Sequence, residues 1–105
     1  DEGRATLALM RHQLHARGDP SPRALQEALD VLASADLRDD APRIGARTLV
    51  IAGARDTLAP AAAGEWLAGA LPHATFARID GAAHAPFLSH REAFDRALDG
   101  FLDAR

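Results

Sequence analysis

TLVIAGARD, residues 48–56, is a short apolar run that ends at a glycine and is followed, three residues on, by an aspartate. The run shows no polar alternation, so both of its faces should be covered, as in a strand of a parallel sheet. Residues 74–79 predict a second strand, which closes at Asp80 and Gly81. Between the strands, a helix is expected over residues 60–71, because prolines stand at its start and just past its end.

The C-terminal residues predict a loop over residues 82–88 and then a final helix that runs to about Ala104. Ser89 and Glu92 have the spacing of a capping box at the start of this helix. Its inward face is expected to carry Phe94, Leu98, Phe101 and Leu102. The order strand-helix-strand-helix is typical of crossover units in a parallel α/β sheet. Because two parallel strands leave both sheet edges open, the rest of the sheet is expected to lie elsewhere.

The first part of the chain has a different pattern. Apolar residues at three- and four-residue spacing predict a helix over residues 2–16 and, after the Ser-Pro start at Ser21, a second helix to about Ser34. A polar connector follows over residues 35–46. Its expected contacts with a core are Leu37 and Ile44.

Composition and charge argue against several classes of function. The chain has 105 residues, 12 basic and 15 acidic, and no long basic run, which argues against nucleic acid or an anionic membrane as the main partner. No stretch is apolar for long enough to span a membrane, and no signal-peptide pattern is recognised at the start. The absence of cysteine excludes disulfides and thiolate metal sites and fits a reducing compartment, so we expect a cytoplasmic protein. Because the first residue is Asp1 and the only methionine is Met10, the chain is expected to be trimmed or to begin inside a longer protein.

Two polar residues follow the ends of the two predicted strands. Asp56 stands just past the first strand, at the sheet end where open α/β folds place their sites. Taken alone, it is better explained as an aspartate that caps the turn before residue 60. His84 stands in a loop of small residues after the second strand. Taken alone, it fits a general base and a histidine bonded to backbone equally well.

Together these two residues indicate chemistry. They are expected at the same sheet edge, where the carboxylate can accept from one ring nitrogen while the other faces a nucleophile. The order of Asp56 before His84 matches the last two members of a Ser-Asp-His triad. None of the serines lies in G-x-S-x-G, and Ser89 is better explained as a helix cap; the three are Ser21, Ser34 and Ser89. The chain is therefore expected to carry an acid and a base but no nucleophile.

No functional role is predicted for the other histidines. His12 and His15 lie three apart on one helix face, but no further ligand is placed to complete a metal site, and none is expected. His73 and His90 are expected to be solvated. The buried face of the third helix is expected to carry Trp66, Leu67 and Leu71.

The segments LVIAGARD (49–56) and GAAHAPFLSHREAF (81–94) resemble the C-terminal part of the α/β-hydrolase superfamily. Within it, they are most similar to the BioH family of pimeloyl-[acyl-carrier protein] methyl ester esterases of biotin synthesis. The resemblance implies an α/β fold in which residues 39–105 form the C-terminal portion of the hydrolase core, with two parallel strands and flanking helices. Residues 1–38 would be the closing helices of an α-helical cap.

The same resemblance implies roles for individual residues. Asp56 would be the triad acid and His84 the triad base of a serine carboxylesterase, and Phe87 would line the substrate pocket. Arg4 and Arg11 would contact the acyl carrier protein that bears the ester substrate, although both also fit ordinary solvated positions. The serine would come from the missing N-terminal part of the same hydrolase, which would act as a monomer without a metal or organic cofactor.

Two alternatives stay open. Another α/β-hydrolase, such as a lactonase or a carbon–carbon bond hydrolase, would share the acid and base segments and differ in its cap. A non-catalytic interaction module could also keep a hydrolase-like half, and the missing serine favours this alternative for the chain taken by itself.

Overall fold

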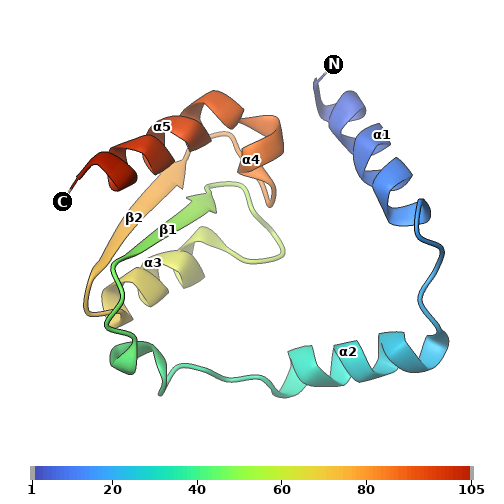
Figure 1. Cartoon of the computed structure of the whole chain (residues 1–105), viewed down its shortest axis with the longest axis horizontal. Coiled ribbons are helices and arrows are strands. Elements are labelled where there is room, and N and C mark those ends of the chain that lie inside the picture. Colours follow the sequence, from blue (N-terminus) through green and yellow to red (C-terminus); the bar gives the residue numbers. More distant parts are fainter. Residues whose placement is uncertain (1, 105) are drawn as a thin grey trace. The chain divides into compact units, whose positions relative to one another are not determined.

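The computed structural model describes residues 2–104, which divide between Leu37 and Arg38 into two units. The first, here the helical unit, contains α1 (Glu2–His15) and α2 (Pro22–Ser34) (Figure 1). Helix α2 begins as the sequence predicts. The Ser21 hydroxyl oxygen accepts from the Ala24 N–H at 3.1 Å, and Pro22 occupies the first helical position, where no N–H is needed.

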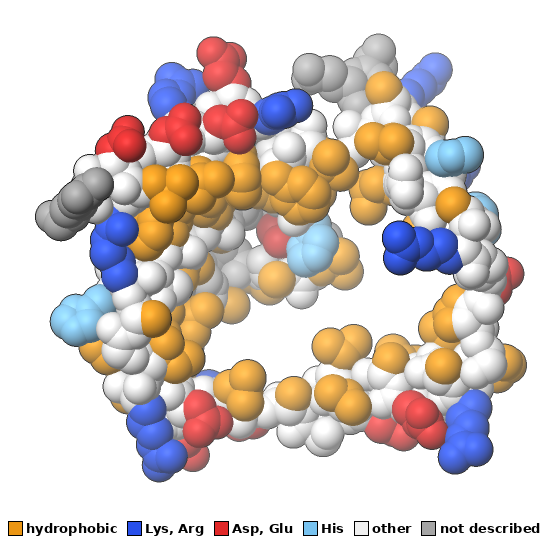
Figure 2. All heavy atoms as spheres, in the orientation of Figure 1, with side chains coloured by type: hydrophobic (Ala, Val, Ile, Leu, Met, Phe, Trp, Pro, Cys, Tyr) orange, Lys and Arg blue, Asp and Glu red, His pale blue; other side chains and the backbone are white. Residues whose placement is uncertain are grey.

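Both helices of this unit are amphipathic, as predicted from the spacing of their apolar residues. Figure 2 shows hydrophobic side chains gathered along one side of α2. The exposed apolar side chains of the two helices include Leu7, Met10, Leu14, Leu25, Leu29 and Leu32. Among the described residues, no helix is long and apolar enough to cross a membrane.

The second, here the α/β unit, begins at Arg38. Its elements are η1 (Ala41–Arg43), β1 (Thr48–Gly53), α3 (Ala61–Ala70), β2 (Ala74–Ile79), α4 (Pro86–Ser89) and α5 (Arg91–Asp103). Strands β1 and β2 pair in parallel, with a register that runs from Thr48 opposite Ala74 to Gly53 opposite Ile79. The predicted parallel pair and its crossover helix are therefore confirmed.

Helices α3 and α5 lie on either side of the two strands (Figure 1), and each contacts both of them. Helix α3 approaches the sheet closely at Gly64, where a Cβ would stand 3.3 Å from the Ala52 Cβ and from the Phe76 ring. In α5, charged side chains line one side and hydrophobic side chains the other (Figure 2). The apolar face of α5 therefore turns to the sheet, as its period predicts.

Several predicted core positions are wrong. Leu37 and Ile44 are exposed, and the buried residue of the connector is Ala41, because η1 turns this small side chain inward. On α3, Trp66 and Leu67 are exposed. The helix meets the sheet at Gly64, and Trp66, two residues further on, lies on the opposite side of the helix. Of the predicted face only Leu71 is buried. The last predicted inward residue of α5, Leu102, is also exposed.

The segment after β2 also differs from its prediction. Residues 86–89 form the helical turn α4 instead of a loop, with Pro86 at its first position. Ser89 ends this turn, and the residue that precedes α5 is His90, which makes no side-chain cap bond. The capping box predicted for Ser89 and Glu92 is therefore wrong: the Ser89 hydroxyl turns back to the Ala85 carbonyl.

The end of α5 is held by Arg47, which precedes β1. The Arg47 guanidinium donates to the carbonyl oxygens of Phe101 and Ala104, in the last turn of the helix. It also lies 3.9 Å from the centre of the Phe101 ring. A cation at the negative end of a helix and over an aromatic face is stabilising on both counts. This contact fixes α5 against the start of the sheet.

Candidate active site

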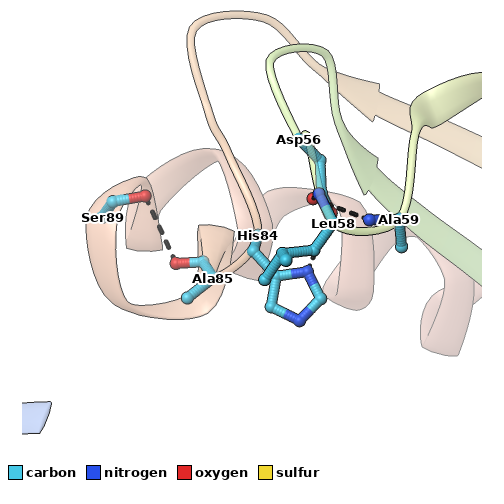
Figure 3. Close-up of polar contacts among 6 residues, drawn as sticks. All are labelled: Asp56, Leu58, Ala59, His84, Ala85 and Ser89. Carbon is cyan, nitrogen blue, oxygen red and sulfur yellow. Dashed lines mark hydrogen bonds and ion pairs between the residues drawn. The ribbon is translucent and has the colours of Figure 1, made fainter.

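The carboxylate of Asp56 uses both of its oxygens. Oδ1 accepts from the Leu58 N–H at 2.9 Å and from the Ala59 N–H at 3.0 Å (Figure 3). Oδ2 lies 3.0 Å from His84 Nδ1. Each of the two interpretations that the sequence leaves open accounts for one of these oxygens, and the catalytic role of Asp56 stays a prediction. One oxygen caps the turn before α3, and the other holds the histidine.

These donors hold the pKa of Asp56 below its ordinary value of 3.8. The Ala59 amide is the main cause, and hydrogen bonding from His84 and Leu58 acts in the same direction, while burial acts against them. The side chain of Asp56 is only 7% exposed. At neutral pH the carboxylate is charged and can only accept, so the hydrogen between the two residues belongs to His84 Nδ1.

His84 projects from the loop after β2, and 59% of its side chain is exposed. With its hydrogen on Nδ1, the neutral imidazole carries a lone pair on Nε2, which is directed away from Asp56 (Figure 3). This is the arrangement that a general base requires, because one nitrogen is held by the acid and the other can take a proton.

A close backbone approach brings the two loops together. The Arg55 N–H donates to the Ala82 carbonyl at 2.8 Å, and the Ala54 N–H donates to the Ile79 carbonyl at 3.0 Å. At Gly53, an added Cβ would stand 2.5 Å from the Ala82 oxygen. Residue patterns alone assign Gly53 no role beyond the end of the strand. A glycine that closes a strand just before a polar residue was the signal that could have found it.

The three serines of the chain form hydrogen bonds within their own helices. Ser21 caps α2, and Ser34 donates to the Asp30 carbonyl at 2.8 Å. Ser89 donates to the Ala85 carbonyl at 3.2 Å. None of these hydroxyl groups bonds to His84 in the part of the chain that the structure describes. The geometry agrees with the prediction that the nucleophile is not among these serines.

A shallow cavity of about 190 Å³ lies beside the acid–histidine pair. Its lining residues are Ile51, Ala52, Gly53, Asp56, Ala59, Pro60, Gly64, His84 and Pro86. Phe87 is not among them. It is 52% exposed and packs edge-on against Phe94, with ring centres 6.1 Å apart. Its place in a substrate pocket stays a prediction.

No protein-family model matches the chain. It is 43% identical over 99 residues to the pimeloyl-[acyl-carrier protein] methyl ester esterase of Xanthomonas axonopodis pv. citri, a match that covers 94% of this chain and 39% of that protein. The protein of the same name from Chromobacterium violaceum is 42% identical over 102 residues, which cover 97% of this chain and 39% of the relative.

Solved structures show the same likeness. A thermophilic esterase from Thermogutta terrifontis superposes with a TM-score of 0.62 at 30% identity, over 64% of this chain and 25% of the esterase. An alpha/beta hydrolase enzyme from a lagoon-sediment metagenome gives a TM-score of 0.69 over 91% of this chain and 43% of its own, at 24% identity, and so shows the fold. The chain resembles the C-terminal part of the α/β-hydrolase superfamily and has its fold.

The chain spans 39% of the length of the two curated relatives. The predicted fold class, the C-terminal portion of an α/β-hydrolase with two parallel strands and flanking helices, is confirmed. Other assignments stay predictions: a cap formed by residues 1–38, and carrier contacts at Arg4 and Arg11, which are exposed on α1. Across residues 2–104, no three His, Cys, Asp or Glu side chains gather as metal ligands would.

The Asp56 carboxylate should make the stability of the chain depend on pH. Its folded-state pKa is depressed, so it stabilises the fold at pH values above 3.8, and this stabilisation is lost as the pH falls below 3.8 and through the lowered folded value. Asp56→Asn should therefore be less stable than the natural chain at neutral pH. Urea unfolding at a series of pH values should show this difference shrinking in acid. A difference that stays constant from neutral pH to about pH 2 would contradict the assignment.

Proposed function

We propose that this chain supplies the acid and the base of a serine carboxylesterase whose nucleophile lies in residues outside it. The observation that carries the proposal is the 3.0 Å contact of His84 Nδ1 with Asp56 Oδ2, at the carboxyl ends of two parallel strands. The proposed substrate is a pimeloyl methyl ester carried on acyl carrier protein. Relatives named for that activity support it, at 43% identity across 94% of the chain.

The catalytic steps follow from the tautomer of His84. Nε2 takes the serine hydroxyl proton as the serine oxygen bonds to the ester carbonyl carbon. Asp56 keeps the ring oriented and stabilises the imidazolium that forms. The tetrahedral intermediate then collapses, the bond to the methoxy oxygen breaks, and Nε2 gives its proton to the leaving methanol. Water repeats the sequence, with the same base, and releases the free carboxylic acid and the serine.

Further parts of the proposal concern substrate binding. Residues 1–38 would roof the acyl chain as a cap, with Phe87 lining the pocket below. Arg4 and Arg11 would contact the carrier protein, and their exposure on α1 is compatible with that role. The complete enzyme would be a cytoplasmic monomer that uses neither a metal nor an organic cofactor.

Supplying the missing part tests the proposal. The N-terminal portion of the Xanthomonas esterase that this chain does not match should be joined to residue 1, giving what is here called the joined enzyme. We expect it to hydrolyse a short p-nitrophenyl ester and to release methanol from the carrier-linked methyl ester, while this chain by itself does neither. Absorbance and methanol assays measure the two reactions.

The outcomes separate the alternatives. A joined enzyme that folds, as shown by circular dichroism, but hydrolyses neither ester would contradict the esterase and favour a non-catalytic interaction module. If it hydrolyses the p-nitrophenyl ester but not the carrier-linked one, the acid–base pair is supported and the proposed substrate is wrong. Lactone and carbon–carbon substrates would then be the next to assay.

A further inference from the structure

A serine–histidine contact follows His84 a few residues further along the chain. Ser89 Oγ is 2.8 Å from His90 Nδ1. It is also 3.2 Å from the carbonyl oxygen of Ala85, the residue that follows His84, and Figure 3 shows this second contact. Both side chains are partly buried. The sequence predicts a helix-capping serine and a solvated histidine here, and the structure shows neither.

The donors in this contact can be assigned by counting hydrogens. A hydroxyl has one hydrogen, which Ser89 Oγ gives to the Ala85 carbonyl. The roles in the Ser89–His90 contact depend on the tautomer of His90. With the hydroxyl hydrogen on Ala85, the fitting tautomer carries its hydrogen on Nδ1 and donates it to Ser89 Oγ. Two hydrogen bonds in series therefore connect the His90 ring to the backbone immediately after His84.

The opposite side of the His90 ring meets the start of the same loop. A Cβ on Gly81 would stand 3.4 Å from His90 Nε2. Gly81 has a φ of 82°, in the left-handed region that favours glycine, so the chain turns sharply where the ring packs. The imidazole thus lies against the first residue of the 81–85 loop and, through Ser89, holds the last.

We propose that His90, acting through Ser89, is a positioning residue that fixes the 81–85 loop and thereby the contact between His84 and Asp56. Its importance for catalysis rests on the proposed role of His84 as the base, but the contact itself is measurable without catalysis. Backbone hydrogen bonds also hold this loop: the Ala82 carbonyl accepts from the Arg55 N–H, and the Ala85 carbonyl accepts from the Leu88 and Ser89 N–H groups. The Ser89 hydroxyl is the side-chain bond that adds to those at Ala85. His84 lies between Ala82 and Ala85, so loss of the Ser89 side-chain bond should let its ring turn away.

Nitrogen-15 NMR of the histidine rings in this 105-residue chain tests the proposal directly. At about pH 8, where an ordinary imidazole is neutral, His84 and His90 should both carry their hydrogen on Nδ1. In Ser89→Ala and His90→Ala, the His84 signals should shift to those of a mixture of the two tautomers. His90→Asn keeps an N–H donor near the Nδ1 position and should restore the natural His84 signals. His73→Ala, in the turn before β2, is the matched control and should leave them unchanged.

A second readout separates positioning from general loosening. Loss of the His84 donor should raise the pKa of Asp56 toward its ordinary value, while the Leu58 and Ala59 amide signals stay where they are, because their bonds to Oδ1 remain. Collapse of those amide signals as well, without rescue by His90→Asn, would assign His90 a merely structural role and overturn the proposal.

Either of two results would overturn the proposal, whatever the activity of the joined enzyme. If His90 in the natural chain carries its hydrogen on Nε2, the bond series is wrong and the proposal fails. If His84 is unchanged in both alanine variants, the proposal fails even where the joined enzyme is active. If the His84 signals change in the alanine variants but the joined enzyme is inactive, the positioning role of His90 is supported and the proposed esterase activity is contradicted.

Discussion

His84→Ala should lower kcat of the joined enzyme on a p-nitrophenyl ester by on the order of 10⁶-fold, because the members of a catalytic triad act as a unit and loss of the base costs about as much as loss of all three. The structure gives the physical reason. Asp56 Oδ2 already holds the Nδ1 side of this ring, and the exposed Nε2 side is where the serine proton must go. KM should change little, since the imidazole acts on the proton and not on the acyl chain.

The control for this substitution is His73→Ala, which removes an imidazole from an exposed turn of the same unit and should leave kcat within about twofold, as expected for a surface change away from any site. Circular dichroism should show that both variants keep their secondary structure. If His84→Ala retained a tenth or more of kcat, another group would be the base, and the acid–base assignment would be wrong.

The sequence predicts the Asp56–His84 pair for two reasons. Local residue patterns predict each strand, and the topology of a parallel sheet places the ends of both strands at one edge. An unbroken apolar run predicts a buried strand, and successive parallel strands end at one sheet edge, so Asp56 and His84 are brought near each other by chain order alone. The same reasoning predicts the helices, whose ends carry Ser21, Pro22 and Pro60 as start signals.

The features that the sequence does not predict depend on how closely segments approach. Trp66 is expected in the core because it is large and apolar, but α3 meets the sheet at Gly64, and Trp66 lies on the opposite side of the helix. Ser89 has the spacing of a helix cap. Its hydroxyl instead bonds to Ala85, because Pro86 starts a short helical turn four residues earlier than the predicted helix. Neither distance is encoded in residue spacing.

The two oxygens of Asp56 make different contacts, which the sequence alone does not predict. An aspartate after a strand can be explained either by the residue preferences of turns or by the order of residues in a Ser-Asp-His triad. The carboxylate makes the contacts that each role requires, with Leu58 and Ala59 on one oxygen and His84 on the other. The turn amides orient the carboxylate toward His84, so the turn role supports the proposed catalytic one.

Gly53→Ala should destabilise the chain by at least about 3 kcal/mol, the upper end of the usual cost of overpacking. The added Cβ would stand 2.5 Å from the Ala82 carbonyl oxygen and closer still to that of Ala83. Both are backbone atoms, which cannot rotate aside as a flexible side chain can. Because small domains are stable by only about 5–15 kcal/mol in total, the midpoint of urea unfolding should fall steeply.

Gly69→Ala is the matched control, because a Cβ there meets nothing within 4 Å and the residue lies inside α3. The same added methyl group should stabilise the chain by about 1 kcal/mol, the helix preference of alanine over glycine. If Gly53→Ala lowers the free energy of unfolding and Gly69→Ala raises it, the lost stability at Gly53 is caused by the close approach of the 82–83 backbone. Because that approach carries His84 to Asp56, any folded Gly53→Ala chain should also lose the Nδ1–H signal of His84. Equal effects at the two glycines would mean that the loops are not held together at this point.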